Sequence, residues 1–189
     1  MKSKDVKSSV CPWWASSILT ASIRKPFHNP LRILSPYVAD GMTVMDVGCG
    51  VGYFSIPMSR LVGKQGKVIA VDLQPEMLEG LKKSAVKVGT TNIIPRQCAQ
   101  ESLLVEQWNG TVDFVLVFYM LHEVPDPERL IKELHEALTP GGKVLFAEPI
   151  MHVGSSAFQS SSKMIAASGF IVAGEPKIPL SRARLFQRS

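Results

Sequence analysis

Short apolar runs alternate with longer amphipathic segments along most of the chain. The runs that predict strands lie at residues 44–46, 67–72, 91–96, 112–118, 143–148, 170–175 and 182–187. Apolar residues at helical spacing predict helices at about 52–62, 75–88, 100–107, 126–138 and 155–168. Alternation of strand and helix, with strands that are almost continuously apolar, is typical of a parallel sheet covered on both faces. The pattern therefore predicts a doubly wound α/β fold.

Several element boundaries carry their own signals. Asp126 is expected to cap a helix whose first residue is Pro127, and the sequence Thr139-Pro140-Gly141-Gly142 is expected to end that helix. Proline cannot donate to a sheet ladder, so Pro95 predicts an edge position for the third strand.

A glycine-rich turn follows the first predicted strand, in the sequence VMDVGCGVGYF at residues 44–54. Glycines at positions 48, 50 and 52 suit a backbone that turns sharply and lets a ligand lie against it without an intervening Cβ. A second strand ends at Asp72, twenty residues past Gly52. In doubly wound folds an acid at this position faces the ribose of an adenosine, so Asp72 is the leading candidate for a ribose ligand.

The same features also occur in nicotinamide dinucleotide sites. The dinucleotide fingerprint has a small third residue, G-x-G-x-x-G/A, that lets the helix pack on the strand. Here that position holds Tyr53, followed by Phe54. The bulky residues favour a ligand that has no pyrophosphate bridge.

Four motifs in order resemble the class I S-adenosylmethionine-dependent methyltransferases, most closely the ubiquinone/menaquinone-type small-molecule group. They are VMDVGCGVG, VIAVDLQPEML, VDFVLVFYMLHEVPDP and LTPGGKVLFAEP, spread over roughly residues 40–150. The resemblance implies S-adenosylmethionine as cofactor, S-adenosylhomocysteine as product, and a seven-stranded Rossmann-like sheet whose last two strands form an antiparallel ending. It also implies an N-terminal helix that covers the cofactor, for which residues 11–23 are the candidate. Trp13 and Trp14 would then face the substrate, with packing on the sheet as the alternative role.

The resemblance assigns roles to particular positions. Asp46 would hold the amino group of the cofactor and the glycine turn would lie under its methionine part. Ala99 stands where the family often has an acid for the adenine. Either Gln100 or Glu101 would compensate for this departure, or backbone groups would contact the adenine instead. The full set of expected cofactor ligands is Asp46, Gly48, Cys49, Gly50, Gly52, Tyr53, Asp72, Leu73, Met77, Gln100, Glu101 and Phe118.

Two candidate catalytic residues follow the fourth strand, where ligands of such sheets bind. Tyr119 offers a hydroxyl or an aromatic face near the sulfonium. His122 is placed to act as a base near neutral pH, with a structural hydrogen bond as the alternative role. Glu148, at the end of the fifth strand, is a further candidate.

Composition indicates the number of domains, the location of the protein and whether it binds a metal. With 189 residues and 46% apolar content, the chain is expected to form one domain, 1–189, with a helical lid segment at 1–40, a cofactor-binding core at 41–150 and a C-terminal part at 151–189. Neither a membrane span nor a signal peptide is recognised, so we expect a cytoplasmic protein. The three cysteines match no metal-binding spacing, and no metal is expected.

The expected partner is a small-molecule methyl acceptor, bound by a monomer or homodimer. Net charge is +5, with basic residues gathered at both ends, but no aromatic residues are interleaved with them to support nucleic-acid binding. Two alternatives stay open: a cofactor-binding protein that has lost turnover, suggested by Ala99, and a nicotinamide oxidoreductase, disfavoured by Tyr53.

Overall fold

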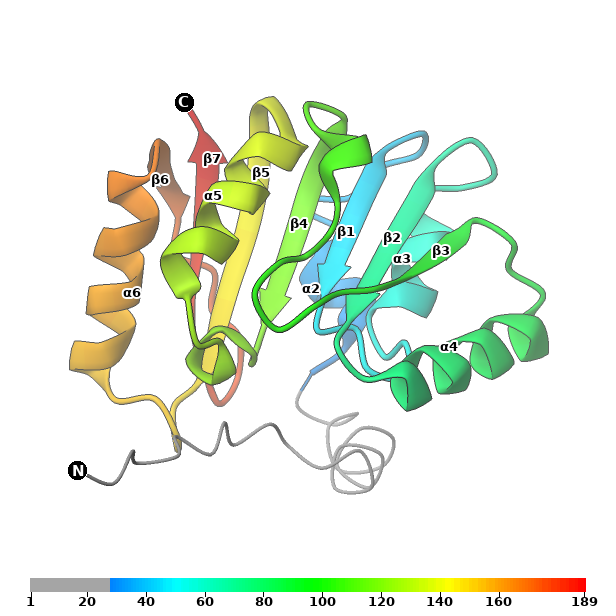
Figure 1. Cartoon of the computed structure of the whole chain (residues 1–189), viewed down its shortest axis with the longest axis horizontal. Coiled ribbons are helices and arrows are strands. Elements are labelled where there is room, and N and C mark those ends of the chain that lie inside the picture. Colours follow the sequence, from blue (N-terminus) through cyan, green and yellow to red (C-terminus); the bar gives the residue numbers. More distant parts are fainter. Residues whose placement is uncertain (1–27) are drawn as a thin grey trace, which may run out of the picture.

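A computed structural model describes residues 28–189 as a seven-stranded sheet flanked by helices (Figure 1). The strand order is β3-β2-β1-β4-β5-β7-β6. The strands are β1 Thr43–Val47, β2 Lys67–Asp72, β3 Ile93–Gln97, β4 Val112–Phe118, β5 Leu138–Pro149, β6 Phe170–Gly174 and β7 Ser181–Arg188. The predicted doubly wound α/β class is confirmed.

Strand directions also agree with the sequence-based expectation. The pairs between neighbours from β3 to β5 are all parallel, and β7 runs antiparallel to both β5 and β6. β3 lies at one edge of the sheet, as Pro95 predicted. The strand order reverses at β1, because β2 lies on one side of it and β4 on the other, and this leaves a crevice at the carboxyl ends of these strands.

Helices cover both faces of the sheet. They are α2 Pro30–Leu34, α3 Ser55–Leu61, α4 Pro75–Val88, α5 Pro127–Ala137 and α6 Ser155–Ala167. Apolar residues of α5 and α6 pack in one core with the facing side chains of the sheet, and those of α2, α3 and α4 pack on the opposite face. Within residues 28–189, no helix has the length and apolar character needed to span a bilayer.

The predicted helix at 100–107 is wrong. This segment is a loop with one short 3₁₀ turn, η1 Glu106–Trp108. The Ala99 amide donates to the Ser102 carbonyl (2.8 Å), and Leu104 has a φ of 54°, which an α-helix does not allow. The predicted helix at residues 11–23, with Trp13 and Trp14, lies outside the described residues.

The core between the sheet and helices α5 and α6 contains a stacked pair of aromatic rings. Phe146 on β5 is fully buried and its ring stacks on that of Phe158 on α6, with centroids 5.1 Å apart. Phe146→Ala is expected to lower the free energy of unfolding by about 3–5 kcal/mol, because it removes buried apolar area and leaves a cavity. Urea denaturation followed by circular dichroism measures this loss. A loss below about 1 kcal/mol would show that the ring does not support the core.

Candidate functional site

A cavity of about 250 Å³ opens at the carboxyl ends of β1, β2 and β4. Its volume is near the lower end of the range for small-molecule sites, about 300–1,000 Å³. Of the predicted cofactor ligands, those that line it are Asp46, Gly48, Cys49, Gly50, Tyr53, Asp72, Leu73, Met77, Gln100, Glu101 and Phe118; Tyr119 lines it as well. Gly52 and His122 are absent from the lining.

The glycine turn is fixed against β2 by backbone hydrogen bonds. The amides of Gly48 and Cys49 both donate to the Val71 carbonyl, at 2.9 and 3.0 Å. A Cβ on Gly50 would meet no atom within 4 Å, so the backbone there is open to a ligand. A Cβ on Gly52 would lie 2.4 Å from Leu81 Cδ1, so Gly52 serves the packing of α4.

Asp72 joins the end of β2 to the turn. One carboxylate oxygen accepts from the Gly50 amide (2.8 Å) and the other from the Gln74 amide (3.0 Å). The side chain is buried, and desolvation raises its pKa in spite of these hydrogen bonds. Because a carboxylate oxygen can accept two hydrogen bonds, Asp72 retains acceptor capacity toward the cavity.

Asp46 lies deeper in the same cavity, with 3% of its surface exposed. The Ser55 hydroxyl, at the start of α3, donates to its carboxylate at 2.5 Å. Desolvation raises the pKa of Asp46 to about 7, and the neighbouring Asp72 charge adds to the shift. Sequence reasoning missed Ser55. Its only signal is a hydroxyl in the first turn of the helix that follows the glycine loop.

Glu133 on α5 supplies a carboxyl group to the cavity, in which Ala99 stands at the position where an acid was expected. Glu133 lines the cavity, and its Oε2 accepts from the Leu103 amide at 2.6 Å. Arg129, one turn earlier on α5, lies 3.3 Å from the other oxygen. Sequence reasoning also missed Glu133, which is thirty positions away from Leu103 and belongs to another element.

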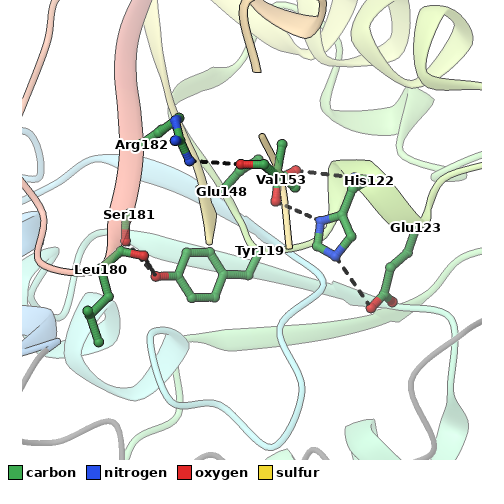
Figure 2. Close-up of polar contacts among 8 residues, drawn as sticks. All are labelled: Tyr119, His122, Glu123, Glu148, Val153, Leu180, Ser181 and Arg182. Carbon is green, nitrogen blue, oxygen red and sulfur yellow. Dashed lines mark hydrogen bonds and ion pairs between the residues drawn. The ribbon is translucent and has the colours of Figure 1, made fainter. Parts of the chain in front are cut away.

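Tyr119 is held in an unusual backbone conformation, with a φ of 63°. Figure 2 shows its hydroxyl pointing toward the start of β7, where it lies 2.5 Å from Ser181 Oγ and 3.2 Å from the Leu180 carbonyl. Its ring stacks on Phe118, with centroids 4.3 Å apart. A bulky residue at positive φ costs free energy and persists only where surrounding contacts impose it. The ring therefore forms a fixed wall of the cavity.

His122 is bound to Glu148 beside the cavity (Figure 2). Its Nδ1 lies 2.7 Å from Glu148 Oε2, and its backbone amide donates to Oε1 at 3.1 Å. Glu148 is 2% exposed, and its hydrogen bond raises the pKa of His122 above the ordinary value, with the Glu148 and Glu123 charges adding to the shift. His122 Nε2 lies 3.9 Å from Glu123, which does line the cavity.

The cysteines near the cavity are kept as neutral thiols. Burial raises the pKa of Cys49 well above its ordinary value and that of Cys98 to about 11. Across residues 28–189, no three His, Cys, Asp or Glu side chains come together as a metal site.

A parallel sheet with one antiparallel strand, a glycine turn after β1 and an acid at the tip of β2 define the class I methyltransferase architecture. A sequence model of a methyltransferase domain matches residues 39–175. The chain belongs to this family, the S-adenosylmethionine-dependent methyltransferases.

Relatives and solved structures agree with this assignment. The chain is 36% identical, over 71% of its length, to a ubiquinone biosynthesis O-methyltransferase of Xanthomonas euvesicatoria pv. vesicatoria, and 33% identical, over 63%, to a demethylmenaquinone methyltransferase of Lactococcus lactis. It covers 55% and 48% of those proteins, so it spans about half the length of the curated relatives. A methyltransferase structure from Aquifex aeolicus shares the fold, with a TM-score of 0.82, 22% identity, and coverage of 93% of this chain and 97% of that one.

Proposed function

We propose that this protein transfers the methyl group of S-adenosylmethionine to an oxygen of a small aromatic acceptor of the quinone-precursor type, by in-line displacement. The main support for this proposal is the cavity at the carboxyl ends of β1, β2 and β4, which is lined by the glycine turn, two buried acids and aromatic side chains. Family membership supports methyl transfer, and the name of the Xanthomonas relative supports O-methylation.

The residues of the cavity fit the methyl donor. The open side of Gly50 leaves room for a ligand against the backbone, and Asp72 beside it has acceptor capacity for ribose hydroxyls. Asp46 offers a buried carboxyl for the amino group of the donor. Leu73 and Met77 would flank the adenine, and Gln100, Glu101 and Glu133 supply polar groups around it.

The donor supplies a methyl group on a sulfonium that is already a good leaving group, so the protein needs neither a covalent nucleophile nor a metal. Its own residues position the acceptor and exclude water. Phe118, Tyr119 and Met120 give the cavity an apolar side next to the donor ligands. The fixed ring of Tyr119 would orient an aromatic acceptor.

His122 is the proposed general base. In its neutral form, donation from Nδ1 to Glu148 leaves Nε2 as the proton acceptor. Because Nε2 lies 3.9 Å from the cavity-lining Glu123, a hydroxyl bound beside Glu123 comes within reach of it. Glu148 acts as a positioning residue that holds the imidazole in this tautomer.

Transfer of a labelled methyl group to a panel of catechols, hydroquinones and small amines tests the proposal. We expect label in the hydroxylated aromatic compounds, because the cavity combines a donor site with an apolar wall. Tight binding of S-adenosylmethionine without transfer to any compound would favour the alternative of a cofactor-binding protein without turnover. Binding of NAD instead would favour the oxidoreductase.

A further inference from the structure

The charged side chains that line the donor cavity are all acidic among the residues that the structure describes. Six carboxyl side chains line it, and within residues 28–189 no lysine, arginine or histidine does. These acids are Asp46, Asp72, Glu101, Glu123, Asp126 and Glu133. Glu133 has a partial partner in Arg129 and Glu123 has one in His122, but the two most buried acids, Asp46 and Asp72, form no ion pair with any residue in 28–189. Within this part of the chain, no cation therefore balances a negative charge on either of them.

Asp46 is the more deeply placed of the two. The groups that face it are the hydroxyl and the backbone amide of Ser55 from α3, the Asp72 carboxyl from β2 and the Cys49 thiol from the glycine turn. β4 contributes the apolar Phe118 to the same cavity. Two donors from a single residue compensate only in part for an ionised carboxylate with 3% exposure beside a second acid. Burial accordingly raises the pKa of Asp46 to about 7.

We propose that binding of the methyl donor expels the proton of Asp46, so that this pocket takes up a cation and releases a proton in one step. The inference rests on the proposed function, because the donor is S-adenosylmethionine. In this step the O–H bond of the Asp46 carboxyl breaks, the proton passes to the solvent, and the carboxylate stays beside the positive charges of the donor. Asp72 remains held by the amides of Gly50 and Gln74.

The same charge balance separates donor from product. S-adenosylmethionine carries a net positive charge, whereas S-adenosylhomocysteine has lost the sulfonium charge and is neutral overall. Both ligands keep the ammonium group proposed to lie beside Asp46, and the donor alone adds the sulfonium charge. The product is therefore expected to release the proton as well, with a somewhat smaller count at the same pH.

Calorimetric titration with S-adenosylmethionine in buffers of different ionisation enthalpy counts the protons. We expect release of about 0.9 proton per site at pH 6 and about 0.5 at pH 7, with an affinity about fivefold higher at pH 7. S-adenosylhomocysteine should give a smaller count. Donor binding with the same heat in every buffer would overturn the inference. Failure of both ligands to bind would instead refute the proposed function.

Asp46→Asn is expected to abolish the proton release and its pH dependence. The matched control is Asp113→Asn, which alters a carboxyl that accepts from the Thr43 amide at the amino ends of β4 and β1, opposite the cavity. This control should give the wild-type proton count. Wild-type release in Asp46→Asn would assign the proton to another group and overturn the proposal. If Asp46→Asn does not fold, the count in the unmodified protein decides.

Discussion

Asp72→Ala is expected to weaken binding of S-adenosylmethionine by about 100-fold or more. The carboxylate would bind the ribose, and it also accepts from the Gly50 and Gln74 amides that shape the glycine turn. Hydrogen bonds to a charged group contribute about 1.5–3 kcal/mol each, and a loss of about 2.8 kcal/mol corresponds to a 100-fold change in affinity. Isothermal titration calorimetry measures the dissociation constant directly.

Asp113→Ala is the matched control for this variant. It also removes a carboxylate that accepts from a backbone amide, that of Thr43 at 2.9 Å, but it lies away from the cavity. It should lose some stability and keep its affinity for the donor. Wild-type affinity in Asp72→Ala would refute the ribose role of this residue.

His122→Ala is expected to lower kcat by about 100-fold to 10,000-fold while changing the affinity for the donor by less than about twofold. Loss of a general base has an effect of this size, and His122 stands outside the donor cavity.

A base acts in its neutral form, so wild-type activity should fall as pH drops through the raised pKa of His122. Glu148→Gln should lower that pKa and move the acidic limb of the profile to lower pH. Single-turnover methyl transfer measured across pH gives the rate of the transfer step and the pKa of the acidic limb.

The exposed His152, in the loop after β5, provides the control for this experiment. His152→Ala should keep both the rate and the pH profile of the unmodified protein. An unchanged kcat in His122→Ala would show that the His122–Glu148 pair has a structural role and that another group, or water, takes the proton.

The strands and most helices were predictable because their signals are local. β2 and β4 are mostly apolar runs, and Asp126 caps α5 through the Arg129 amide, as its sequence position indicated. β5 begins at Leu138, five residues before the predicted start. Its extra pairing, Leu138 with Val112, depends on a neighbouring strand that local sequence does not describe.

The features that were predicted wrongly or missed depend on contacts between segments that are distant in the sequence. The loop at 98–105 resembles a helix in sequence, but the Asp72 carbonyl holds the Cys98 amide and Glu133 holds the Leu103 amide. In the site, the position of Asp72 followed from strand and glycine spacing. The bonds from Ser55 to Asp46 and from His122 to Glu148 did not, because packing of separate elements creates them.

A crystal structure of the protein with S-adenosylhomocysteine would locate the cofactor site. We expect the adenosyl group in the cavity between the glycine turn and the loop after β3, with the ribose hydroxyls on Asp72 and the amino acid end near Asp46. Density for the ligand at another place on the protein, or none at saturating concentration, would refute this site.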